Sequence, residues 1–437
     1  MLPITEALPL AGFVFWLISF PMNGFLMPEQ WGNYLFYFTF SSAVSYFLSP
    51  FFLKKEKVFD ILSRLGTLLV VLLTLLSPLS QISGKVMLSL MGILSVFVMF
   101  RSIAVLRSSR DPLVSAALAI AIGNVLVFAL SHLNLQDIFK FFIVAASLFP
   151  AIIISAEYSE DSNTGEIKKY LAFIFIFYLV GGILYAYIMP QYEKVTIFNG
   201  FELLSYVFSA LVGIYFVKKR RDIALALGII LGTLSFSFML LGGSFFTTLS
   251  MFSSQASFGL VDLYIVFLLV ACGGTARITG LGFGTVCLAI TCGEAVSSYI
   301  DGATAPVIAT GNIILVTSVI IFYLTILREK GGFSVAEDVI GGNNSESLEK
   351  GIFKGELEEI LERSYEPFQK RLSEKEKSVL LLVIQGKTYR DAATDLGISE
   401  STVKTHMKRI CEKMGVYNKD DLMEKLLSNS RTDITAS

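Results

Sequence analysis

Histidine, cysteine and charged residues are scarce in this chain. Its 437 residues include two histidines and four cysteines, and charged residues make up 16% of the total. No Cys-x-x-Cys pair occurs, and only His132 and His406 could supply imidazole, so neither a disulfide framework nor a metal site is predicted. The chain also lacks a P-loop, a dinucleotide-binding glycine motif and a recognisable nucleophile–base pair. We therefore expect no cofactor and no enzymatic activity.

Hydrophobic residues, in contrast, are abundant. They make up 54% of the chain and include 37 phenylalanines, a composition that is too apolar for a soluble protein of this length and typical of a membrane protein. A helix needs roughly 20 apolar residues to span a bilayer. Candidate spans lie at about residues 8–27, 33–53, 65–83, 86–106, 112–132, 139–157, 170–190, 201–217, 222–243, 258–276, 281–299 and 304–327.

The basic residues between these segments predict their orientation. If the N-terminus is cytosolic, the cytosolic turns hold most of the lysines and arginines, including Lys54, Lys55, Arg107 and the cluster 218–221. The outer turns offer only Lys85, Lys140 and Lys194. Because Lys and Arg concentrate in cytoplasmic loops, both termini are expected in the cytosol and the protein in the cytoplasmic (inner) membrane.

The candidate spans divide into two sets of six. A polar loop, "EYSEDSNTGEIKKY", separates the sixth span from the seventh, and a basic cluster follows both the second span and the eighth. This six-plus-six layout resembles the major facilitator transporters, whose halves are repeats around a central cavity. The family's Gly-x-x-x-Asp-x-x-Gly-Arg loop is not reproduced, because "FFLKKEKVFDILSRLG" keeps only basic charge and Arg64-Leu65-Gly66.

Polar residues inside candidate spans are potential ligand-binding or coupling residues, because burying them in lipid is costly. Asp262 and Glu294 fall toward the outer half of spans ten and eleven, Arg101 falls toward the inner half of span four, and Asn23 lies in span one. Two of these have plainer interpretations. Arg101 could extend to the cytosolic interface, and Asp262 could precede a span that begins later. The run 280–284, rich in glycine, predicts close helix packing.

The composition changes after residue 328. We predict a membrane sensor domain over 1–328, a linker with an amphipathic connector helix over 329–370, a DNA-binding domain over 371–430 and a disordered tail over 431–437. The linker is rich in Gly, Asn and Ser. The connector helix has two interpretations: it packs on its own DNA-binding domain, or it forms a dimer.

Four short helices are predicted in the C-terminal region. The first opens with a capping box of Ser373 and Glu376, and the second contains Ala392 and Ala393. The third, over 399–414, is capped by Ser399 after Gly397 and has an apolar seam of Val403, Met407, Ile410 and Met414. Its opposite side carries Ser401, Lys404, Thr405 and Lys408, with Arg409 at the edge. A short helix, a glycine turn and a basic helix form the helix-turn-helix plan.

Residues 372–427 resemble the LuxR/NarL-type helix-turn-helix domain. The matching positions are Leu372-Ser373, Glu376, Gly386, Ala392-Ala393, Leu396, Ser399, Thr402-Val403-Lys404, His406, Ile410 and Lys413-Met414-Gly415-Val416. The resemblance implies that Lys404, Thr405 and Lys408 contact bases, and that Ser401, Thr402 and Arg390 contact phosphates. Leu422, Met423 and Leu426 correspond to the dimerising helix of the family. His406 borders the apolar seam, which favours a structural role.

Together these patterns predict an all-α chain of about twelve membrane helices followed by a four-helix LuxR-type domain. The function that they favour is a membrane-integrated one-component transcription regulator, with promoter DNA, the lipid bilayer and an unidentified small molecule as partners, and a homodimer on DNA. One alternative is a facilitator-type transporter with a regulatory DNA-binding tail. Another is a membrane scaffold whose tail binds a protein.

Overall fold

The computed structural model divides the chain into two compact units, Met1–Gly342 and Asn343–Ser437. All of the elements that it describes are helices, as predicted for the all-α class. The residues it describes are 3–22, 24–79, 82–156, 158, 165–196, 200–219, 221–274, 276–299, 309–317, 373–384 and 389–414. The first unit contains the membrane helices, and the second contains the helix-turn-helix.

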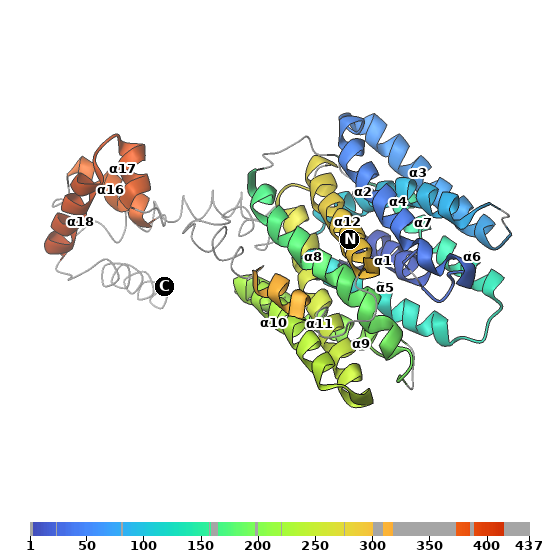
Figure 1. Ribbon diagram of the computed structural model, residues 1–437. Coiled ribbons are helices and arrows are strands. Elements are labelled where there is room, and N and C mark those ends of the chain that lie inside the picture. The colour runs from blue at the N-terminus through green and yellow to red at the C-terminus, as the bar shows by residue number, and fades with distance from the viewer. Residues whose placement is uncertain are drawn as a thin grey trace, which may run out of the picture. The chain divides into compact units, whose positions relative to one another are not determined.

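The first unit is built from two groups of helices (Figure 1). The first group is α1 (Pro3–Ser19), α2 (Leu35–Leu48), α3 (Glu56–Leu76), α4 (Gly84–Arg107), α5 (Pro112–His132), α6 (Asp137–Ala146) and α7 (Phe149–Ile153). The second is α8 (Gly165–Tyr192), α9 (Leu203–Lys219), α10 (Arg221–Leu241), α11 (Gly243–Ala271) and α12 (Ala276–Tyr299), and residues 309–317 are also helical. The groups meet where α2 packs on α12, α5 on α9 and α4 on α11.

An exposed apolar face runs along α3. Its exposed side chains include Ile61, Leu65, Leu68, Leu72 and Leu76, which recur every three or four residues and therefore lie on one face. Among the described residues, seven helices are long and apolar enough to cross a membrane, by length and composition. They are α3, α4, α5, α8, α10, α11 and α12. The number of twelve spans therefore stays a prediction.

Several predicted spans have different ends in the structure. α1 stops at Ser19, before Pro21, and the sixth span is broken into α6 and α7, with Pro150 in the first turn of α7. Proline cannot donate a backbone hydrogen bond and clashes with the preceding turn of a helix, which accounts for both breaks. The predicted span 8–27 is therefore too long at its C-terminal end.

The largest difference is the tenth span, which was predicted to begin at residue 258 and begins at Gly243. Serines made this stretch look interrupted. In the structure they bond across to α10: Ser253 donates to the carbonyl of Leu231 at 2.7 Å, and Ser257 donates to that of Gly228 at 2.5 Å. Serine hydroxyls satisfied by a neighbouring helix are compatible with burial in a membrane bundle.

Close packing at the glycines of α12 is confirmed. A Cβ on Gly280 would lie 2.5 Å from the carbonyl oxygen of Tyr46, and one on Gly284 would lie 2.9 Å from the ring of Phe47. Both contacts are with α2, so these glycines allow the two groups of helices to approach each other closely.

The second unit contains α16 (Glu374–Ile384), α17 (Tyr389–Leu396) and α18 (Glu400–Met414). Its core is formed by Val379, Leu380, Val383, Ala392, Ala393, Val403, Met407, Ile410 and Cys411. α18 packs on both α16 and α17. The predicted linker, connector helix, fourth helix and tail lie outside the described residues.

Candidate nucleic-acid interface and buried polar sites

The start of α18 is set by the residues expected to set it. Gly397 has a φ of +63°, in the left-handed region where glycine is favoured, and it separates α17 from α18. The hydroxyl of Ser399 then accepts the backbone N–H of Thr402 at 3.2 Å, as an N-cap does. Val403 and Ile410 are fully buried and Met407 is nearly so. The predicted apolar seam is therefore confirmed at these three positions.

The opposite face of α18 is exposed. Ser401, Lys404, Thr405, Lys408 and Arg409 all lie on the surface of the unit. The ammonium of Lys404 is 2.7 Å from the carboxylate of Glu400, one turn earlier, but its side chain remains 59% exposed. Such a pair contributes little stability in water and can exchange for another anion. This face presents cations and hydroxyls without a core residue between them.

The capping box of α16 is confirmed and has an additional partner. The Glu376 carboxylate accepts the backbone N–H of Ser373 at 2.7 Å, and the Ser373 hydroxyl accepts the N–H of Glu376 at 3.3 Å. The same carboxylate accepts from the ammonium of Lys413 at 2.7 Å. This ion pair with Lys413, together with the cap, lowers the pKa of Glu376 to about 2. It ties the last turn of α18 to the first turn of α16.

Other predicted residues of this unit are only partly described. Thr402 is half-buried, and its hydroxyl lies 2.7 Å from that of Ser399. Arg390 lies on α17, but its side chain is outside the described residues, as are Leu422, Met423 and Leu426. His406 is half-buried, in keeping with its place beside the seam.

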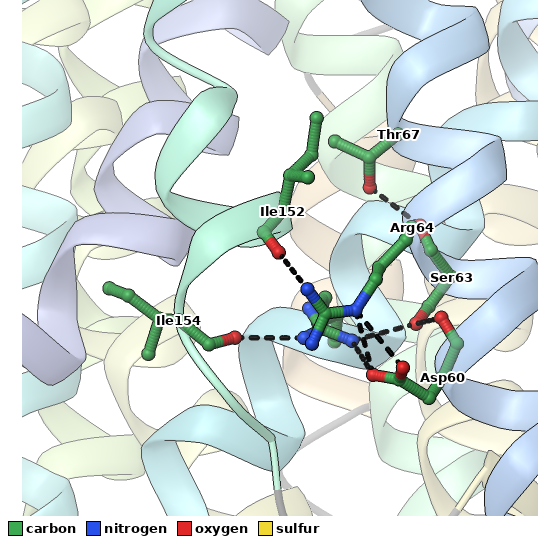
Figure 2. Close-up of polar contacts among 7 residues, drawn as sticks. Asp60, Ser63, Arg64, Thr67, Ile152 and Ile154 are labelled. Carbon is green, nitrogen blue, oxygen red and sulfur yellow. Dashed lines mark hydrogen bonds and ion pairs between the residues drawn. The ribbon is translucent and has the colours of Figure 1, made fainter.

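In the membrane unit, the side chain of Arg101 is fully buried within the protein. Its guanidinium donates to Asp60 at 2.8 Å, to the Ser63 hydroxyl at 3.1 Å and to the carbonyl of Ile154 at 2.8 Å (Figure 2). Arg64 donates to the same Asp60 carboxylate at 2.9 and 3.0 Å. These partners come from α3 and from the residue that follows α7, and their hydrogen bonds compensate for the burial of the guanidinium.

Asp262 is the centre of a second polar cluster. Its carboxylate accepts hydrogen bonds from the hydroxyls of Tyr178 on α8 and Tyr206 on α9. α11 begins at Gly243, 19 residues before Asp262, so Asp262 lies well inside this helix. The alternative that it precedes the span is wrong for the same reason.

Glu294 lies at the boundary between the two groups of helices. Its carboxyl group is hydrogen-bonded to the backbone of Phe36, in the first turn of α2. One carboxyl oxygen, Oε2, is buried and has no hydrogen-bond partner within the described part of the chain. Three residues earlier, Thr291 donates to Thr39 of α2 at 2.9 Å. Asn23, the remaining candidate, lies outside the described residues.

Sequence reasoning did not find the partners of these charged groups. Asp60, Tyr178 and Tyr206 have no motif or spacing that relates them to Arg101 or Asp262. A tyrosine in an apolar helix is typical of a core or interface position. Only the packing of α8 and α9 on α11 brings the two hydroxyls to the Asp262 carboxylate.

Comparison with known proteins identifies the second unit. Residues 370–426 match the family model described as bacterial regulatory proteins, luxR family. The spore germination protein GerE of Bacillus subtilis (strain 168) is 36% identical over 56 residues, which are 13% of this chain and 76% of GerE. The transcriptional regulatory protein MctR of Rhizobium johnstonii is 29% identical over 96 residues, and the transcriptional activator protein CarR of Pectobacterium carotovorum subsp. carotovorum is 43% identical over 56 residues. These stretches are 22% and 13% of this chain, and they span only 42% of MctR and 23% of CarR.

Solved structures resemble the fold of the membrane unit. The E. coli fucose:proton symporter FucP aligns with a TM-score of 0.54 at 13% identity, over 74% of this chain and 98% of that structure. The human organic anion transporter MFSD10 aligns with the same TM-score at 12% identity, over 73% of this chain and 97% of its own. At such identities the likeness establishes a shared facilitator-like fold and nothing about substrates.

Proposed function

Because the chain belongs to the luxR family of bacterial regulatory proteins, we propose that it is a membrane-integrated one-component transcription regulator. Its C-terminal unit binds promoter DNA, and its membrane unit senses a small molecule. The observation that carries this proposal is the exposed basic face of α18, backed by a buried seam, in the same chain as a facilitator-like membrane fold. One polypeptide then joins the signal to the promoter without a relay protein.

DNA is contacted through α18 in this proposal. Lys404, Thr405 and Lys408 reach base edges in the major groove, where ammonium groups donate to guanine and hydroxyls bond in either direction. Phosphates are held by Ser401, Thr402, Arg409 and Arg390. A two-fold dimer, formed through Leu422, Met423 and Leu426, places two such helices about one helical turn of DNA apart.

The membrane unit supplies the signal. A ligand shifts a conformational equilibrium only if its affinity differs between the two states, so the site must lie where the helices rearrange. Glu294, Asp262, Arg101 and Asn23 are the candidate ligand or coupling residues. The concentration of basic residues in alternate turns supports a location in the cytoplasmic membrane, with both termini in the cytosol. The linker and connector 329–370 pass the change to the DNA-binding unit by allowing or blocking dimerisation.

The test is to crosslink the intact protein to DNA in cells and sequence the bound fragments. Lys404→Ala should weaken specific binding by roughly 10- to 100-fold, and adding Lys408→Ala should remove the enriched sites. Arg409→Ala, which removes a proposed phosphate contact, should flatten the salt dependence of binding in vitro by about 0.9 in the logarithmic slope. Lys375→Ala is the matched control, because this exposed lysine lies on α16. Equal enrichment by the double variant and the wild type would refute DNA reading by α18.

The facilitator-like fold favours one second candidate, a transporter with a regulatory DNA-binding tail. This function requires net movement of a solute across the membrane. Sealed vesicles containing the protein would accumulate a substrate, and Glu294→Gln would reduce that uptake. A sensor without transport would bind its ligand without accumulation, so uptake separates the two functions.

A further inference from the structure

The carboxylate of Asp262 is held inside the membrane unit without a balancing charge. Both of its hydrogen-bond donors, Tyr178 and Tyr206, are neutral hydroxyls, and no cation is paired with it among the described residues. Arg101 is the contrasting case in the same unit, since it is buried and paired with Asp60. Hydrogen bonds satisfy the lone pairs of a carboxylate, but a charge at membrane depth is still costly unless an opposite charge joins it.

Asp262 is also reachable. From Gly259 to Cys272 every residue of the chain is buried except Asp262, which is half-buried. Asp262 therefore keeps accessible surface inside an otherwise buried stretch of α11. The hydroxyls of Tyr178 and Tyr206 approach it from two other helices, so the carboxylate is presented by α8, α9 and α11 together.

Aromatic rings lie next to this carboxylate. Phe258 is one turn before Asp262 on α11 and therefore shares its face of the helix. The Phe258 ring centroid is 6.4 Å from that of Tyr178 and 5.7 Å from that of Phe177. Aromatic faces attract cations, most strongly where water is excluded. A carboxylate flanked by rings is the combination that recognises an organic cation.

We propose that Asp262, with Tyr178 and Tyr206, forms the binding site for a small organic cation, a protonated amine. The ammonium group pairs with the Asp262 carboxylate, and its apolar part lies against Phe258. A divalent metal ion is a poorer match, because calcium takes six to eight oxygen ligands, whereas the described residues contain no group of three metal-ligating side chains. If the chain is the proposed regulator, this amine is its signal. The binding site itself does not depend on the regulatory function.

The position of the site connects it to the other half of the unit. Gly182, one turn after Tyr178 on α8, approaches α12 so closely that a Cβ would lie 2.7 Å from the carbonyl oxygen of Ile290. α12 is in turn bonded to α2 through Thr291 and Thr39. If amine binding shifts Tyr178, α8 should therefore displace α12. A displaced α12 would in turn change the contact between the two groups of helices.

The experiment uses the purified full chain in lipid nanodiscs and matched probes. Benzylamine and phenethylamine provide the protonated amines, while benzyl alcohol and 2-phenylethanol provide uncharged molecules of similar shape. Affinities come from calorimetric titration. The wild type should bind at least one amine and discriminate against its alcohol by at least about tenfold, because a hydrogen bond to a charged group is worth more than one to a neutral group. Failure of both amines to bind, or equal binding of the alcohols, overturns the proposal.

Variants locate the site. Asp262→Asn keeps the shape and removes the charge, so it should lose amine binding about tenfold or more. Tyr178→Phe and Tyr206→Phe each remove one hydroxyl and should weaken binding by a smaller factor while keeping the preference for amines. Asp137→Asn, an exposed carboxyl in the same unit, is the control and should bind normally. Unchanged binding by a folded Asp262→Asn protein also overturns the site.

The DNA crosslinking test separates this proposal from the regulator function. Amine binding by a protein that enriches no DNA would support the cation site and refute the regulator. Enriched DNA sites in a protein that binds no amine would support the regulator and refute the site. If both hold, amines should change the enrichment of the wild type and leave that of Asp262→Asn unchanged.

Discussion

Two cations, Arg101 in the membrane unit and Lys404 in the helix-turn-helix, show how differently the two units treat charge. Arg101 has no exposed surface, and it is held by Asp60, Ser63 and a backbone carbonyl. Lys404 is 59% exposed and has one carboxylate beside it on its own helix. A cation in an apolar interior needs fixed partners, whereas one in water can exchange them. The buried cation thus has its partners within the fold, whereas the exposed one can exchange its partner for a ligand.

The largest effect expected from this difference is on stability of the membrane unit. Arg101→Gln leaves the Asp60 carboxylate with Arg64 alone and removes the bond to the Ile154 carbonyl, so we expect a loss of about 3 kcal/mol. The value lies at the lower end for a broken buried pair, because Asp60 is 45% exposed. Thermal unfolding of the full chain in nanodiscs would show it as a lower midpoint. Arg64→Gln changes a side chain that is 40% exposed and should destabilise the unit clearly less. Equal losses of stability in the two variants would contradict the difference between buried and exposed cations.

An intermediate effect is expected at the Lys413–Glu376 pair, where the carboxylate is 4% exposed and the ammonium 38%. The folded pKa of Glu376, about 2, lies below its ordinary value of 4.5. The pair therefore stabilises the unit above pH 4.5, and that stabilisation is lost as the pH falls toward 2, by about 1–2 kcal/mol after allowance for screening.

Hydrogen exchange of α16 and α18 in the full chain, corrected for intrinsic rates, measures this loss. Glu376→Gln should flatten the pH dependence between pH 5 and 2, because the group no longer titrates. Glu412→Gln on α18, at an exposed carboxyl, is the control and should leave the pH dependence unchanged. A Glu376→Gln profile as steep as that of the wild type would assign the loss to other groups.

The smallest effect concerns the serines of α11. Ser257→Ala removes the hydrogen bond to the Gly228 carbonyl and should destabilise the membrane unit by about 0.6 kcal/mol, the average for such bonds between membrane helices. Thr248→Ala is the comparison, because that hydroxyl bonds to the carbonyl of Ser244 within its own helix. A lower unfolding midpoint for both variants alike would show that the bond between α10 and α11 contributes nothing specific.

Much of the second unit follows from sequence alone. The caps at Ser373 and Ser399, the helix break at Gly397 and the seam of Val403, Met407 and Ile410 were predicted and are confirmed. Such features depend on residues within one turn of each other, so local spacing determines them. The ion pair between Lys413 and Glu376 joins residues 37 apart, and spacing does not indicate it.

The sequence predicted the structure less accurately where residues far apart in the chain are in contact. The start of α11 was placed 15 residues too late, because Ser253 and Ser257 are polar in the sequence and acquire partners only from α10. Arg101 and Asp262 were recognised as costly inside a span. Their surroundings were not, since Asp60, Tyr178 and Tyr206 lie on other helices.

The sequence by itself determined the all-helical class, the presence of apolar helices long enough for a membrane and the family of the C-terminal unit, because composition and short-range periodicity express them directly. The tertiary structure alone decided which buried charges are neutralised. Arg101 is paired with a carboxylate, whereas Asp262 is hydrogen-bonded to two hydroxyls. The packing of α3, α8 and α9 determines which partner each charged group has. The physical reason is that solvation of a buried charge comes from neighbours in space, whereas the sequence specifies only neighbours along the chain.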